Sequence, residues 1–142
     1  MIFNCSIGDL FVIRTAGHTV DAIVRETIEY AILQLHTPQL IVMGHEECGA
    51  IISAADAYTK MNPDSDNGEI INTLQPVITA VYQSEKNYDT LIHDAVIENI
   101  KYTIRHITNS SSVIQTAAAD NSLSIQGALY SLKSGCVEII PV

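Results

Sequence analysis

A chain of 142 residues, 47% of them hydrophobic, is long enough for one domain with a single buried core. Its 7 basic residues are scattered singly among 16 acidic ones, for a formal net charge of −9, so we expect no binding to nucleic acid. It has neither the run of roughly 18 to 20 apolar residues that a membrane helix needs nor the basic start of a signal peptide, which predicts a cytoplasmic protein without a membrane partner.

The N-terminal part of the chain predicts a strand, a helix and a second strand. Residues 9–15, DLFVIRT, have the β-branched and aromatic content of a strand. Residues 20–36 repeat apolar side chains at helical spacing, with Asp21 placed to cap the helix and Pro38 just beyond its end. Residues 40–44, LIVMG, form a short and wholly apolar run, which is typical of a strand covered on both faces.

Helices dominate the central part. Residues 48–60 and 69–83 have helical patterns, and residues 61–68 between them are the one clear loop. Pro76 is expected to kink the second helix or to end its first part. A longer helix is predicted for residues 88–107, and the polar residues 108–112 mark its end or a break.

The C-terminal part predicts a hairpin. Residues 123–142 alternate apolar and polar side chains around KSG at residues 133–135. Strands followed by helices indicate an α/β domain over residues 1–142, with a mainly parallel sheet flanked by helices and a C-terminal antiparallel hairpin. Ligands of such sheets bind at the carboxyl ends of the strands.

His45 and Cys48 follow one such strand end, in GHEECGA. Cys48 is expected in the first turn of the next helix, where the backbone N–H groups favour a thiolate. An imidazole and a thiolate are zinc ligands, and Gly49 leaves room for a small molecule beside the sulfur. The alternative is that Cys48 is inert packing. The three cysteines are expected to be reduced, since they are odd in number and widely spaced.

Four segments, GDLFVIRTAGH, ETIEYAILQL, LIVMGHEECGAI and IQGALYSLKSGCVEII, resemble those of the β-class carbonic anhydrases in order and spacing. The resemblance runs over nearly the whole chain. It implies a zinc enzyme in which a bound water or hydroxide converts carbon dioxide to bicarbonate, and a homodimer or higher homo-oligomer. It assigns His45 and Cys48 as two of three zinc ligands, with Gly49 beside them.

One motif of that family, Cys-x-Asp-Ser-Arg, has no counterpart here. The resemblance makes its cysteine the third zinc ligand, its aspartate the partner of the zinc-bound water, and its arginine the group that holds the aspartate. We therefore expect a domain that is incomplete at its N-terminus, with impaired activity. The same motif lies on a strand between the two predicted here, so we expect residues 9–15 and 40–44 to pair directly or the chain to be poorly stable alone.

Several other residues could belong to the site, but each also has an ordinary structural interpretation. Cys5 would lie roughly 20 Å from the strand end that faces the site, so we interpret it as a free thiol near a terminus, and Cys136 as packing. His18 is either a pocket residue or a turn histidine with a common hydrogen bond. Glu46 and Glu47 could relay protons, orient ligands or cap a helix start.

The alternative functions are a catalytically silent binding or assembly module and a hydrolase of carbon disulfide or carbonyl sulfide.

Overall fold

The computed structural model describes residues 2–59, 68–83 and 86–142. Apart from Gly68, the predicted loop at residues 61–68 lies outside them. In chain order the elements are η1 (Ala16–His18), α1 (Ala22–Leu35), β1 (Gln39–His45), α2 (Gly49–Thr59), α3 (Glu69–Val81), α4 (Tyr88–Ser110), α5 (Ser112–Ala119), β2 (Ser124–Tyr130) and β3 (Val137–Ile140). None of the helices in this part of the chain is long and apolar enough to cross a bilayer.

The sheet has the order β1-β2-β3. β1 and β2 run parallel over seven residue pairs, from Gln39↔Ser124 to His45↔Tyr130. β2 and β3 form the predicted antiparallel hairpin over four pairs. The sheet is therefore mixed, with most of its pairing parallel, and the predicted α/β fold class is confirmed.

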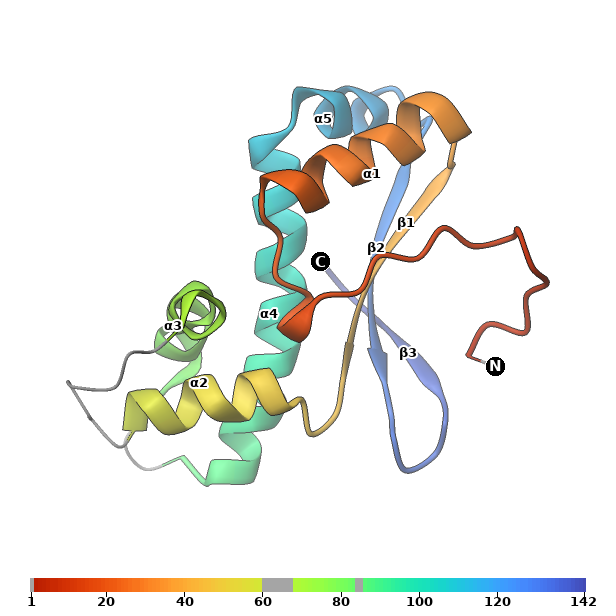
Figure 1. Cartoon of the computed structure of the whole chain (residues 1–142). Helices are drawn as coiled ribbons and strands as arrows, with labels where there is room; N and C mark the ends of the chain where they lie inside the picture. The colour runs from red at the N-terminus through yellow and green to blue at the C-terminus, as the bar shows by residue number, and fades with distance from the viewer. Residues whose placement is uncertain (1, 60–67, 84–85) are drawn as a thin grey trace.

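The long helix α4 packs against one face of the sheet (Figure 1). Its apolar side buries a row of side chains that includes Val96 and Ile100. Glycines in the two facing strands make this close approach possible. A β-carbon at Gly44 would lie 3.0 Å from Ile100, and one at Gly127 would lie 2.8 Å from it. The two glycines thus set the distance between the helix and the sheet.

Local signals account for the starts of α1 and α5. The Asp21 carboxylate accepts a hydrogen bond from the Val24 N–H at the start of α1, as predicted. Ser111 ends α4 and caps α5, which confirms the break within residues 108–112. Pro76 neither ends α3 nor divides it, because the helix continues to Val81. The short helix α5 had no clear pattern in the sequence.

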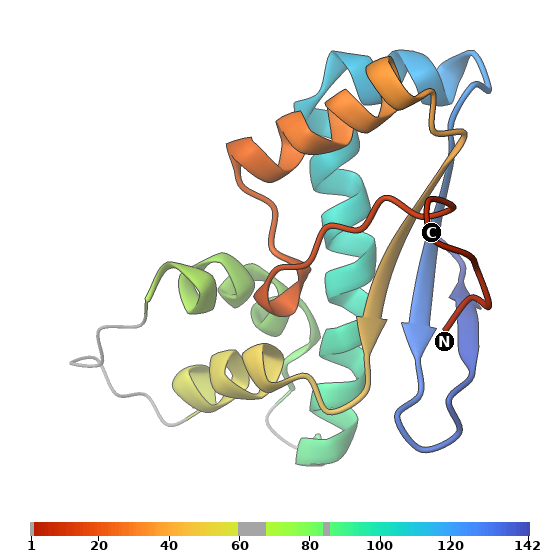
Figure 2. The same ribbon diagram turned by 45° about the vertical axis from the view of Figure 1, so that its right-hand side comes forward.

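Residues 9–15 are not a strand, and this prediction is wrong. A β-propensity is realised only where a neighbouring strand accepts and donates ladder hydrogen bonds, and the structure gives this segment no such neighbour. Its expected direct pairing with β1 does not occur either. Instead, the segment crosses β1 in both views of the molecule (Figures 1 and 2), and its apolar side chains are exposed.

Candidate metal centre

His45 and Cys48 lie at the carboxyl end of β1, on either side of a two-residue turn. His45 is the last residue of the strand. Glu47 has a φ of 54°, and this left-handed conformation turns the chain back toward α2. Cys48 precedes α2 and its carbonyl accepts a hydrogen bond from the Ile52 N–H, so it is the N-cap residue rather than part of the first turn. Its side chain is buried, with 6% of the residue exposed.

The imidazole of His45 is held in one tautomer. Its Nδ1 lies 2.8 Å from the backbone oxygen of Glu46. A carbonyl oxygen can only accept a hydrogen bond, so Nδ1 carries a proton, and in the neutral ring Nε2 keeps its lone pair. Metal-binding histidines typically donate their second ring N–H in this way, which fixes the ring orientation. Nε2 is therefore the ring nitrogen that the exposed His45 leaves available to a ligand.

Glu46 has a structural role that the sequence did not reveal. Its carboxylate accepts hydrogen bonds from the Ser131 hydroxyl at 2.9 Å and the Leu132 N–H at 3.1 Å. Its own N–H donates to the Tyr130 oxygen. These bonds attach the turn after β1 to the connection after β2. Because the Glu46 carbonyl is fixed in this way, the residue orients His45 through its backbone.

His18 of η1 lies close enough to His45 for the two rings to interact electrostatically. Burial lowers the pKa of His18 from 6.5 to about 4, against the effect of a hydrogen bond between its ring and the backbone of Asn99, and a protonated His45 ring would lower it further. The Nε2 of His18 is buried and has no partner in the described part of the chain. At neutral pH His18 is thus an uncharged neighbour of the candidate site.

Asn99 was missed by sequence reasoning. It is 2% exposed, and its side-chain amide donates a 2.8 Å hydrogen bond to the backbone oxygen of Gly17. This bond attaches η1 to α4. The available signal was a single asparagine on the mostly apolar face of a long helix, where a buried amide needs a partner.

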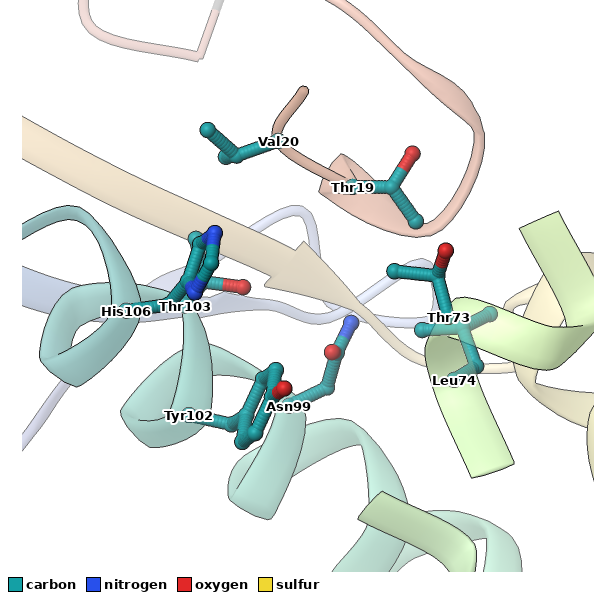
Figure 3. A pocket seen from close by; sticks show the side chains of 8 residues that line it. All are labelled: Thr19, Val20, Thr73, Leu74, Asn99, Tyr102, Thr103 and His106. Atoms are coloured by element: carbon teal, nitrogen blue, oxygen red, sulfur yellow. The ribbon is translucent and has the colours of Figure 1, made fainter. Parts of the chain in front are cut away.

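Two hollows lie near η1. The larger, of about 620 Å³, is open and is lined by Ala16, Gly49, Ala50 and the beginning of α3. A β-carbon at Gly49 would meet no atom within 4 Å. The smaller, of about 40 Å³, is lined by Thr19 and Val20, which follow η1, and by side chains of α3 and α4 (Figure 3). It has room for a few water molecules, since one needs about 10 to 15 Å³.

The described residues do not form a complete zinc site. No three or more histidine, cysteine or acidic side chains among them converge to hold a metal ion. His45 and Cys48 supply two ligands, whereas catalytic zinc normally has three from the protein. Cys5 does not complete the set, since it belongs to no such group among the described residues, and its thiol donates to the nearby Phe3 oxygen. Cys136 is exposed, so the prediction that it packs in the core is wrong. All three cysteines are free of disulfide bonds.

Comparisons with known proteins agree on one family. A family model described as carbonic anhydrase matches residues 1–137. Carbonic anhydrase 2 of Mycobacterium tuberculosis is 31% identical over 135 residues, which are 95% of this chain and 64% of that protein. The carbonic anhydrase of Mycolicibacterium smegmatis is 29% identical over 98% of this chain and 66% of its own length. The chain thus spans just under two thirds of these relatives.

Solved structures show the same fold. The β-carbonic anhydrase CcaA superposes with a TM-score of 0.80 at 25% identity, over 97% of this chain and 65% of that one. A Coccomyxa β-carbonic anhydrase, solved with acetazolamide, gives a TM-score of 0.81 at 24% identity, over 98% and 64% of the two chains.

Proposed function

The chain belongs to the β-carbonic anhydrase family, and from this membership we propose that its activity is the zinc-dependent, reversible hydration of carbon dioxide to bicarbonate. One observation carries the proposal: His45, with Nε2 free, and Cys48, at the start of α2, flank one turn at the carboxyl end of β1. This is the edge at which parallel sheets bind ligands. Gly49, on the open hollow beside Cys48, would line the path of the small substrate.

The described residues offer two of the three ligands that a catalytic zinc needs, so we propose that this chain alone binds zinc weakly and hydrates carbon dioxide near the background rate. Loss of a residue that only supports a ligand typically costs 10- to 100-fold in metal affinity or activity, and loss of a ligand costs more. The same observation favours a second candidate function, in which the chain is a catalytically silent member that serves as a binding or assembly module.

Three further properties are part of the proposal. Residues 1–142 form one domain around a single core that extends over the helices and the sheet. The chain forms a homodimer or a higher homo-oligomer; one solved relative of similar fold is described as tetrameric. Free cysteines fit a reducing, cytoplasmic location.

Stopped-flow hydration of carbon dioxide separates the two functions. The chain is assayed with added zinc beside Cys48→Ser, and Cys136→Ser is the matched control, because it removes an exposed thiol far along the sequence. A low rate that Cys48→Ser abolishes and Cys136→Ser leaves intact supports the enzyme. A rate equal to the uncatalysed reaction in all three proteins supports the silent module.

A further inference from the structure

The turn after β1 and the connection between β2 and β3 lie at the same end of the sheet (Figure 1). Glu46, in the turn, joins the two. Its N–H donates to the Tyr130 oxygen at 3.1 Å, and one of its carboxylate oxygens accepts from both the Ser131 hydroxyl and the Leu132 N–H. Three consecutive residues thus hold Glu46 and leave its carbonyl oxygen to accept from Nδ1 of His45.

The turn holds that carbonyl in a conformation that is unfavourable by itself. Glu47 has a φ of 54°, in the left-handed region that glycine adopts readily and residues with a β-carbon adopt rarely. Rotation of the peptide group between Glu46 and Glu47 would return Glu47 to a negative φ. The same rotation would turn the Glu46 carbonyl away from His45. Without other contacts, the turn would therefore favour a conformation in which His45 loses its hydrogen bond.

The connection after β2 is rigid enough to oppose this rotation. The Ser131 N–H donates to the Cys136 oxygen and the Ser131 carbonyl accepts from the Gly135 N–H, which closes the connection into a tight loop. The Ser131 hydroxyl oxygen also accepts from the Ser134 N–H at 3.3 Å. A hydroxyl has one proton to donate, and this one goes to the Glu46 carboxylate. The loop thus fixes the hydroxyl that holds Glu46.

We propose that Ser131 is a positioning residue of the candidate metal centre. Acting through Glu46, it keeps the Glu46 carbonyl on Nδ1 of His45 and so leaves Nε2 as the nitrogen that is free for a metal ion. The inference rests on the proposed function for the use of Nε2. The tautomer itself is a property of the metal-free chain, so the two proposals can fail separately.

Nitrogen-15 NMR of the metal-free chain tests this role, because the two ring nitrogens of a neutral histidine have different chemical shifts in its two tautomers. The spectra are recorded under alkaline conditions that keep imidazole rings neutral, and His45→Gln identifies the His45 signals. In the unmutated chain we expect the Nδ1–H tautomer to predominate. Ser131→Ala should lower the ratio of Nδ1–H to Nε2–H about fivefold, which is the effect of one hydrogen bond on an equilibrium.

Paired variants separate this role from a general loss of stability. Ser131→Thr keeps the hydroxyl, and Glu46→Gln keeps an oxygen that can accept both hydrogen bonds, so both should preserve the wild-type ratio. Glu46→Leu has a side chain of similar size without an acceptor, and it should lower the ratio at least as far as Ser131→Ala. Ser134→Ala is the matched control and should preserve the ratio, because its hydroxyl accepts from the Cys136 N–H within the same loop.

Three results would overturn the proposal. They are a wild-type His45 that is mainly the Nε2–H tautomer, a folded Ser131→Ala protein with the wild-type ratio, and a Ser134→Ala protein whose ratio falls as far as that of Ser131→Ala. The last would mean that any weakening of the loop has the same effect. Circular dichroism establishes that each variant is folded. If Glu46→Leu does not fold, Ser131→Ala decides the question, since two of the three bonds that hold Glu46 remain in it.

Discussion

Asn99 of α4 and Gly17 of η1 lie 82 residues apart in the sequence and are joined by a 2.8 Å hydrogen bond in the core. Removal of the amide leaves a carbonyl oxygen without its partner, so Asn99→Ala should lower the free energy of unfolding by about 1 to 3 kcal/mol. Urea unfolding followed by circular dichroism measures the difference. Asn109→Ala, an exposed position on the same helix, is the control and should change stability by less than about 0.5 kcal/mol. Equal losses in the two variants would refute the role given to Asn99.

Gly44 should not tolerate a side chain. The β-carbon of Gly44→Ala would lie 3.0 to 3.1 Å from side-chain atoms of Ile100 and Val96, so these buried side chains would have to move. Overpacking of this kind costs about 1 to 3 kcal/mol. Thermal unfolding compared with Gly49→Ala, where the added carbon meets open space, measures the cost. A Gly44→Ala protein as stable as Gly49→Ala would mean that helix and sheet are not in close contact.

Glu46 should stabilise the turn that orients His45. Its carboxylate accepts two hydrogen bonds, from Ser131 and Leu132, and bonds to a charged group contribute about 1.5 to 3 kcal/mol each. Glu46→Ala removes both bonds and should lower the free energy of unfolding by at least the contribution of one of them, about 1.5 to 3 kcal/mol. Glu138→Ala, an exposed glutamate of β3, is the control for the loss of a charge. Chemical denaturation of both variants checks the prediction, which fails if the two are equally stable.

His18 should make the fold sensitive to mild acid. Its pKa is about 4 in the folded state, against 6.5 in the unfolded chain, so the unfolded state binds the extra proton between these values. His18 therefore does not lower the free energy of unfolding above pH 6.5. As the pH drops from 6.5 to 4, protonation of the unfolded state lowers this free energy by about 3 kcal/mol. His18→Gln should flatten the pH dependence of unfolding in that window, whereas His93→Gln, on the exposed side of α4, should not. Identical pH profiles for the wild-type chain and His18→Gln would exclude this effect.

Elements with strong local signals could be predicted from the sequence. The Asp21 cap, the apolar run of β1 and the turn between β2 and β3 each depend on residues close in the chain, and all three are present. Residues 9–15 failed for a physical reason: the composition of a segment shows that it can form a strand, but a strand also requires a partner. In the described structure that partner is missing.

In the candidate site too, the local features could be predicted from the sequence and the long-range contacts could not. His45 and Cys48 lie where the strand and the following helix were expected, and their role as ligands stays a prediction. The contacts that orient them could not be read from the sequence. Glu46 bonds to a residue 85 positions away, and Asn99 to one 82 positions away, so their partners are fixed only when the sheet and α4 come together.

Zinc affinity, measured by competition with a chromogenic chelator, tests most directly the central claim that this chain supplies two zinc ligands. We compare the chain with His45→Gln and Cys48→Ser, and use Cys136→Ser as the control. The account predicts weak or substoichiometric zinc that either His45→Gln or Cys48→Ser abolishes and Cys136→Ser leaves unchanged, since two ligands hold the metal poorly and neither suffices alone. One tightly held equivalent of zinc, or zinc binding that survives both His45→Gln and Cys48→Ser, would contradict it.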